Sequence, residues 1–101
     1  MKVDSHRENG KIFLKIAGRI DTVTAVDFQK EMELYIKYET KPDIEIDCTD
    51  LEYTSSQGLR TFLVSQKAVA EKNGSMVLIN MRPEVKEVFD ITGFSNIIKI
   101  L

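Results

Sequence analysis

Hydrophobic and polar residues alternate along two short segments at the start of the chain, Lys2 to Glu8 and Lys11 to Ala17, which predicts two β-strands. Asn9-Gly10 stands between them, a dipeptide that tolerates positive φ and suits a tight turn. The second segment places one set of apolar residues on a single face, namely Ile12, Leu14 and Ile16. The chain is therefore expected to open with a β-hairpin.

A helical spacing of apolar residues follows, from Thr24 to about Tyr38. One side of the predicted helix carries Phe28, Met32, Tyr35 and Ile36, and most of the charged residues lie around the remainder. Thr24 is followed three residues later by Asp27, a spacing that resembles a capping box. Pro42 is expected to end this amphipathic helix.

The middle of the chain predicts another strand, a long helix and an apolar strand. Asp43 to Asp47 alternates with period two, so this strand buries one face and offers carboxylates on the other. A helix from about Ser56 to Lys72 closes at Asn73-Gly74, a typical left-handed stop. Met76 to Ile79 is wholly apolar and predicts a buried strand.

The end of the chain predicts a third helix and a last strand. Arg82-Pro83 begins the helix, with proline at its first position, and Gly93 stands just beyond its end. Ile97 to Leu101 is expected to be a short strand. The order β-β-α-β-α-β-α-β predicts one α/β domain over residues 1–101, with a mixed, mainly parallel sheet packed with helices.

The second helix has an unusual surface. Its expected core side holds Leu59, Phe62, Leu63, Val69 and Ala70. Its opposite side holds only uncharged residues, Gln57, Thr61, Val64 and Ala68. A flat, uncharged strip needs little desolvation and favours a docking surface, although small residues there could also reflect packing beneath a loop.

Composition limits the classes of function. The 101 residues are 43% hydrophobic, enough for one core, and 14 basic against 16 acidic residues are interspersed rather than gathered in a basic stripe. Nucleic acid is therefore an unexpected partner. No apolar run approaches the roughly 20 residues of a membrane span, no signal-peptide pattern begins the chain, and a cytoplasmic location is expected. The single cysteine, Cys48, continues the apolar phase of its strand and is expected in the core.

Ser55 and Ser56 stand where the third strand hands over to the second helix. Serine is among the best N-cap residues, so ordinary capping is one interpretation of this pair. The first turn of a helix also has unpaired N–H groups and a partial positive charge, so a phosphate on a serine is accommodated there. Local spacing alone favours capping, and the hypothesis of a phosphorylation switch depends on a resemblance.

The segment Asp47-Cys48-Thr49-Asp50-Leu51-Glu52-Tyr53-Thr54-Ser55-Ser56-Gln57-Gly58-Leu59-Arg60 resembles the signature of the STAS family, the bacterial anti-sigma factor antagonists. Gly18-Arg19-Ile20-Asp21 is similar to the loop that precedes the family's first helix. Weaker matches follow in the right order through Lys72-Asn73-Gly74 to Gly93. The resemblance thus covers nearly the whole chain and implies the STAS fold.

The resemblance implies a protein that binds a serine-kinase anti-sigma factor, frees a sigma factor, and is switched off by phosphorylation. A serine phosphatase restores it. The position that matches the phosphoacceptor is Ser56, with Ser55 as a second candidate. The expected partner contacts are Thr54, Ser55, Ser56, Gly58, Thr61, Val64 and Asp21. This chain departs from the most familiar members, which have Asp in place of Ser55 and a second Ser or Thr in place of Gln57.

The missing Asp before Ser56 favours an alternative, a STAS adaptor subunit of a transport or signalling assembly without a phosphorylation cycle. A small-molecule or nucleotide-binding domain is disfavoured because the chain has no phosphate-cradling glycine loop. An enzyme is not expected, since the only histidine, His6, is far from Ser56 in sequence. Asp21, Asp47 and Asp50 have no completing ligand pattern, so no metal and no cofactor are predicted.

Overall fold

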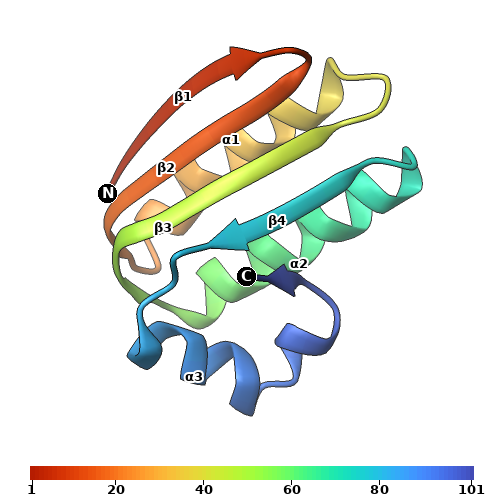
Figure 1. Ribbon diagram of the computed structural model, residues 1–101. Helices are drawn as coiled ribbons and strands as arrows, with labels where there is room; N and C mark the ends of the chain where they lie inside the picture. The colour runs from red at the N-terminus through yellow and green to blue at the C-terminus, as the bar shows by residue number, and fades with distance from the viewer.

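Five strands form one sheet in a computed structural model that describes residues 1–101 (Figure 1). The strands are β1 (Lys2–Glu8), β2 (Lys11–Ile20), β3 (Asp43–Thr54), β4 (Ser75–Ile79) and β5 (Lys99–Ile100), and they lie in sequence order. The helices are α1 (Thr24–Lys37), α2 (Ser56–Glu71), α3 (Pro83–Ile91) and the 3₁₀ turn η1 (Phe94–Asn96). The predicted α/β order with a mixed, mainly parallel sheet is confirmed, because only β1 pairs antiparallel.

The opening hairpin is confirmed at its turn. Asn9 and Gly10 have φ values of 53° and 79°, the left-handed conformation that a two-residue turn between twisted strands requires. The pairing of Glu8 with Lys11 closes the hairpin directly beside this turn. The turn residues therefore fix the register of β1 on β2.

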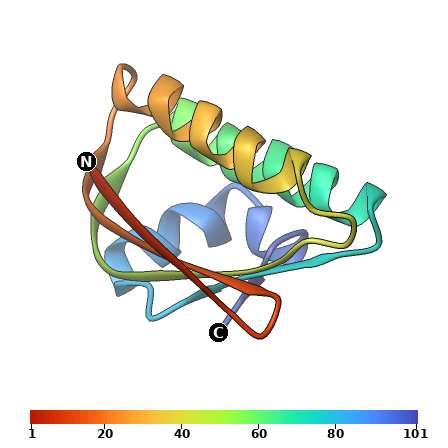
Figure 2. The same cartoon turned by 90° about the horizontal axis from the view of Figure 1, so that it is seen from above.

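The helices α1 and α2 lie side by side on one face of the sheet (Figure 2). They follow the parallel strands β2 and β3, so both helices begin at the carboxyl ends of those strands. Three aromatic rings join the three helices in the core: the Phe62 ring of α2 meets Phe28 of α1 at 5.0 Å and Phe89 of α3 at 5.5 Å between centroids, both edge to face. The contact between Phe62 and Phe89 places α3 beside α2.

The strand β3 is longer than the sequence pattern indicates. Its pairing with β2 skips one residue between Asp47 and Asp50 and another between Leu51 and Tyr53, so β3 carries two bulged residues. Each bulge shifts the alternation by one position, and the period-two pattern read from Asp43 to Asp47 is lost beyond that point. The strand nevertheless continues to Thr54, where α2 follows after a single residue.

The start of α1 corrects the prediction there. Thr24 and Asp27 form no capping box; instead the Asp21 carboxylate accepts the N–H of Thr24 at 2.8 Å, and the Thr24 hydroxyl accepts the N–H of Asp21 at 2.9 Å. The reciprocal pair therefore lies three residues earlier. The helix ends at Lys37 with Tyr38 as its C-cap, in agreement with the predicted end at about Tyr38.

Lys72 satisfies the end of α1. Its ammonium group, at the end of α2, donates to the carbonyls of Ile36, Lys37 and Glu39 at 2.9, 3.1 and 3.1 Å. The last carbonyls of a helix have no partner within the helix and carry partial negative charge. One cation thus joins the carboxyl ends of the two parallel helices.

The final strand is shorter than predicted. The segment Ile97 to Leu101 contains only the two-residue strand β5, Lys99–Ile100, because η1 and the following turn use the chain up to Ile98. Gly93 takes a φ of 80° just beyond α3, as the sequence predicts for a helix stop. The apolar residue that this segment contributes to the core is Ile98.

Two residues end α2, and each has a different role. Asn73 takes the left-handed conformation with a φ of 58°, and Gly74 donates its N–H to the carbonyl of Val69 at 2.9 Å. A Cβ atom on Gly74 would lie 2.1 Å from the carbonyl oxygen of Pro42. Gly74 is therefore required by close packing of two backbone segments.

We expect Gly74→Ala to lower the free energy of unfolding by about 2 kcal/mol or more, because the clash is with backbone that has no rotamer to change. Gly10→Ala is the control without a clash. Gly10 has a positive φ, unlike Gly74, but a Cβ atom on Gly10 would meet nothing within 4 Å. The control should cost about 1 kcal/mol. Urea unfolding of both variants gives the comparison, and an equal loss would contradict the packing role of Gly74.

Candidate functional site

The predicted switch lies where β3 ends and α2 begins. Thr54, the last residue of β3, is paired with Ile20, the last residue of β2. The N–H of Ser55 then donates to the carbonyl of Ile20 at 2.7 Å. The junction between strand and helix is therefore held against the neighbouring strand, and the first turn of α2 has a fixed orientation.

Ser55 is the N-cap of α2. Its hydroxyl oxygen accepts the N–H of Gly58 at 3.2 Å, and its carbonyl accepts the N–H of Leu59 at 3.0 Å. Only 8% of Ser55 is exposed. A hydroxyl that is buried and engaged in this way is poorly placed to meet a kinase.

Ser56 is the first residue of α2 and is exposed. Its hydroxyl makes no hydrogen bond within the chain, whereas the Ser55 hydroxyl is engaged by Gly58. The geometry therefore separates the two candidate serines: Ser55 holds the helix start and Ser56 presents a free hydroxyl. A phosphate on Ser56 would be stabilised by the helix terminus by about 0.3 to 2 kcal/mol.

Thr54 and Gly58 lie beneath the surface. A Cβ atom on Gly58 would come within 2.2 Å of the Thr54 hydroxyl oxygen and 2.8 Å of the Ile20 side chain. Glycine therefore allows the first turn of α2 to approach the ends of β2 and β3. The close approach that Gly58 permits is to its own chain, and neither buried residue is available for direct contact with a visitor.

The prediction that Thr61 lies on an exposed face is wrong. Only 3% of Thr61 is exposed, and its hydroxyl donates to the carbonyl of Gln57 at 3.1 Å. Ser65, one turn later, is also buried. The small residues on this side of α2 let α1 pack closely beside it, so they reflect packing against a helix.

Part of the expected strip remains open. Val64 is 45% exposed, and Gln57 is exposed beside Ser56. A shallow groove of about 270 Å³ follows the seam between the two helices and is lined on its apolar side by Ile36, Val64 and Ala68. Conversely, Ala70, which was expected in the core, is exposed. Glu33 and Lys37 of α1 also line the groove, so the uncharged surface is confined to the α2 side of the seam.

Asp21 caps the start of α1 at the same end of the molecule. Its side chain accepts the N–H groups of Thr24 and Val23 at 2.8 and 3.0 Å and the Thr24 hydroxyl at 3.0 Å. These hydrogen bonds, that of the Thr24 N–H first, hold the pKa of Asp21 below its ordinary value despite the opposing effect of desolvation. A charged carboxylate therefore flanks the switch region.

Several exposed residues near the switch carried no clear sequence signal. Arg19 lies over the ring of Tyr53 at 4.2 Å, across the paired positions just before the last pair of β2 and β3. Val23 and Val26 are 77% and 52% exposed at the start of α1. The only signal for these valines was their place outside the apolar stripe of the helix, where a charged residue is usual.

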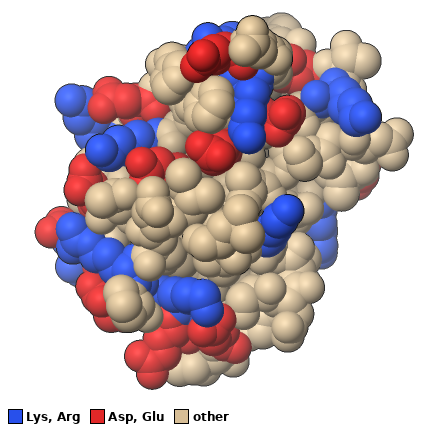
Figure 3. Space-filling model, viewed as in Figure 1, with Lys and Arg blue, Asp and Glu red and all other residues tan.

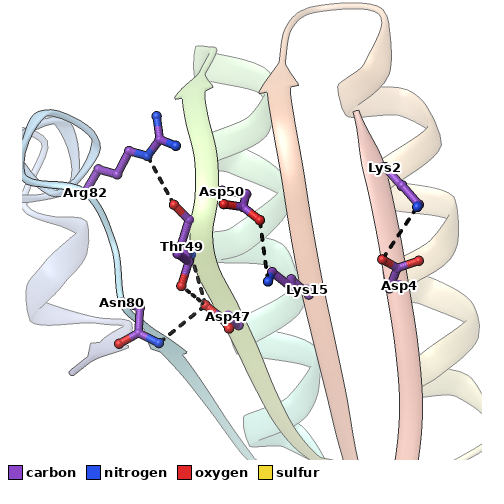
Figure 4. Close-up of polar contacts among 8 residues, drawn as sticks. All are labelled: Lys2, Asp4, Lys15, Asp47, Thr49, Asp50, Asn80 and Arg82. Atoms are coloured by element: carbon purple, nitrogen blue, oxygen red, sulfur yellow. Dashed lines mark hydrogen bonds and ion pairs between the residues drawn. The ribbon is translucent and has the colours of Figure 1, made fainter.

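A polar network surrounds the first bulge of β3 and includes side chains that follow β4 (Figure 4). The Asp47 carboxylate accepts the N–H and the hydroxyl of Thr49 at 2.9 and 2.6 Å and the Asn80 amide at 3.4 Å. Arg82 donates to the carbonyl of Thr49 at 3.1 Å, and Asp50 pairs with Lys15 at 3.4 Å. These contacts fasten the bulged strand to the connection before α3.

Cys48 and His6 fit the structural roles expected of them. Cys48 is fully buried, and burial, with the neighbouring Asp47 charge, raises the pKa of its thiol to about 12. His6 is exposed on β1 and stacks on Phe13. None of the helices combines the length and apolar character needed to cross a membrane.

The STAS domain profile matches residues 2–101, and the chain therefore belongs to the STAS family. The anti-sigma-B factor antagonist of Bacillus subtilis (strain 168) is 33% identical over 100 residues, which cover 99% of this chain and 90% of that protein. The anti-sigma-B factor antagonist of Listeria monocytogenes is 32% identical over 96 residues, which cover 93% and 82%. The resemblance that the sequence motifs carry is confirmed.

Solved structures agree on the fold. The unphosphorylated form of the anti-sigma factor antagonist SpoIIAA has a TM-score of 0.82 at 16% identity, over 99% of this chain and 88% of that chain. An anti-sigma factor antagonist from Mycobacterium paratuberculosis has a TM-score of 0.83 at 17% identity, over 98% and 83%. The arrangement of strands and helices is thus that of known STAS domains.

The different roles of the two serines predict different effects on stability. Ser55→Ala removes the N-cap acceptor and should lower the free energy of unfolding by about 1 kcal/mol. Ser56→Ala removes a hydroxyl without a partner and should change stability by less than about 0.5 kcal/mol. Urea unfolding of the two variants makes the comparison, and an equal or larger loss in Ser56→Ala would refute the assignment.

Asp21 predicts a dependence of stability on pH. Because its folded pKa lies below the ordinary value of 3.8, the carboxylate stabilises the fold fully above that value and progressively less as the pH falls through the folded pKa. Asp21→Asn should therefore be less stable than the native chain near neutral pH, and the difference should shrink in acid. Urea unfolding across this range measures it; a difference that stays constant would count against the prediction.

Proposed function

We propose that this protein is an anti-sigma factor antagonist that binds a serine-kinase anti-sigma factor and thereby frees a sigma factor. Phosphorylation of Ser56 switches it off, and a serine phosphatase reverses the switch. The observation that carries the proposal is the free, exposed hydroxyl of Ser56 at the start of α2, beside a second serine that is buried as the N-cap. Two relatives about one third identical over most of their length bear the name anti-sigma-B factor antagonist.

The proposed contact surface combines exposed residues of α2 with one exposed residue just before α1. Ser56, Gln57 and Val64 belong to α2, and Asp21 stands before α1. Three buried residues have a supporting role in this proposal: they set the position of the first turns of α2 and do not touch the partner. They are Thr54, Gly58 and Thr61. Ser55 has the same supporting role as the N-cap.

The departure from the family's Asp before the phosphoacceptor is compatible with this switch. Asp and Ser are about equally good N-caps, and Ser55 makes the hydrogen bond to Gly58 that an Asp side chain would make. The serine also leaves the first turn of α2 without a negative charge, since no acidic residue lies there. A phosphate on Ser56 would therefore meet less repulsion from its own helix than it would beside an Asp.

The proposed switch acts on the complex more than on the fold. A phosphate adds about −1.5 to −2 charges to an exposed position next to a favourable helix terminus, so the free chain tolerates it. In a complex the same group must lose its water against whatever faces Ser56. Inverting a 99:1 bound population takes about 5.5 kcal/mol, a magnitude that a buried and unpaired dianion supplies.

A binding role also fits the position of the only histidine. His6 lies opposite Phe13, which is paired with Glu45 near the start of β3, whereas Ser56 follows the end of that strand. At about 3.3 Å per residue, the two side chains are more than about 20 Å apart. His6 therefore offers no general base to Ser56, and this supports a regulator in place of a hydrolase.

The test uses candidate serine-kinase anti-sigma factors with ATP, and mass spectrometry maps any added phosphate. We expect phosphate on Ser56 in the native chain and in Ser55→Ala, and none in Ser56→Ala. Ser56→Asp should weaken binding of the anti-sigma factor at least about tenfold relative to Ser56→Ala, because it adds a charge at the interface.

The matched pair of alanine variants keeps the outcome clear, since Ser55→Ala alters the helix cap and Ser56→Ala alters only the free hydroxyl. Phosphate on Ser55 would reassign the switch. No incorporation with any candidate, together with stable co-purification of a transport or signalling subunit, would favour the adaptor alternative and refute the proposal.

A further inference from the structure

The face of the sheet opposite α1 and α2 is uncovered (Figures 1 and 2). Along β2, Ile12, Leu14 and Ile16 point into the core, and the intervening Phe13 and Lys15 are half-buried or exposed on the other side. Figure 3 views this open face, with uncharged atoms across its middle and charged side chains around them. A partly apolar sheet face without a covering layer is unusual in a small domain.

A hollow of about 280 Å³ lies on this open face and crosses four strands, β1 to β4. Two rings form part of its lining: His6 stacks on Phe13 with centroids 4.9 Å apart and planes only 8° from parallel. Ile79 adds an aliphatic wall from β4. The rim carries carboxylates from Asp4, Glu45 and Asp47, of which Asp4 lies 3.9 Å from the Lys2 ammonium and Glu45 lies 3.6 Å from that of Lys11. The hollow thus joins flat apolar surface to negative charge.

The lysines near the hollow are already engaged. Lys15, the only basic residue of the lining, pairs with Asp50 at 3.4 Å, and Asp50 lies outside the hollow (Figure 4). Lys11 reaches over from the edge: its ammonium is 5.5 Å from the centroid of the Phe13 ring and 3.6 Å from Glu45. The chain itself therefore shows that this combination of ring and carboxylate attracts a cation.

Asp47 keeps its negative charge in the hollow. Burial acts to raise the pKa of this carboxyl, but the hydrogen bonds from Thr49 and Asn80 outweigh it and leave the pKa below its ordinary value. Those bonds go to one carboxylate oxygen, Oδ1, so the other oxygen remains open to a donor. Asp47 is thus an ionised acceptor held in a fixed orientation.

We propose that this hollow binds an arginine side chain of a protein partner and is a second docking surface of the chain. A guanidinium is planar and delocalised, stacks on aromatic faces and donates charge-assisted hydrogen bonds to carboxylates, which matches the Phe13 ring and the open oxygen of Asp47. It would take the place of the Lys11 ammonium over the Phe13 ring, whose other neighbour is His6. Its aliphatic stem would lie against Ile79.

The second surface is separate from the proposed switch. It lies on the opposite face of the sheet from α2, whose first residue is Ser56. A partner held here would stay bound when Ser56 gains a phosphate, because the added charge is on the other side of the core. The chain could thus hold one protein constantly while it releases another.

The test uses the complete chain and a short probe peptide, acetyl-Ala-Arg-Ala-amide, with a citrulline analogue that keeps the shape and removes the charge. Titration is followed by the NMR shifts of backbone amides. We expect saturable shifts at His6, Phe13, Asp47 and Ile79, with a dissociation constant in the millimolar range, and at least about tenfold weaker binding of the citrulline peptide.

Two variants and a control locate the site. Asp47→Asn removes the ionised acceptor, and Phe13→Leu removes the ring while keeping apolar volume; both should weaken binding at least about fivefold. Asp43→Asn removes the same charge from the same strand outside the hollow and should leave binding unchanged.

Shifts confined to the helices, equal binding of the citrulline peptide, or no saturable shifts would overturn the inference. Shifts at the same residues that depend on protein concentration without peptide would assign the hollow to a second copy of the chain and overturn it too. None of these outcomes depends on phosphorylation of Ser56, so failure here leaves the proposed switch untouched.

Discussion

One backbone hydrogen bond, from the N–H of Ser55 to the carbonyl of Ile20, extends the pairing of β2 and β3 to the point where both helices begin. On one side of it, the Ser55 hydroxyl caps α2, and on the other, Asp21 caps α1. Gly58 then allows the first turn of α2 to lie against Ile20. With these contacts in place, the next residue, Ser56, has only one direction to face, which is outward.

The order of elements could be predicted from the sequence because most of its signals are local. Asn9-Gly10 marked the hairpin, and Pro83 and Gly93 marked the limits of α3. The extent of β3 could not be predicted in this way, since two bulges within the strand break the alternation that identifies it. Where a strand pairs irregularly, the partner strand determines its length, and a single-sequence pattern does not contain the partner.

The position of the candidate site stays a prediction of the family signature, and the structure adds its geometry. The signature predicts a switch at Ser56 or Ser55, and the N-cap geometry distinguishes the buried hydroxyl of Ser55 from the free one of Ser56. Thr61 was misplaced because a helical projection cannot tell solvent from a neighbouring helix when both tolerate small uncharged residues. A charged residue distinguishes the two cases, because it marks a position that faces solvent: Arg60 and Lys67 are both exposed.

The same sheet offers two surfaces of opposite character, and the core between them keeps them independent. The helix side presents the uncharged residues Val64 and Ala68 of α2 and the free hydroxyl of Ser56, so a single phosphate there would change the charge of this side strongly. The open side presents fixed carboxylates, and Asp47 is held by hydrogen bonds that do not involve α2. The core around Phe62 is closely packed and resists small displacements. A charge added at the exposed first turn of α2 is solvated by water and needs no movement of this core. The proposed phosphate on Ser56 would therefore repel a partner at the helix face without a change of shape that reaches the open face.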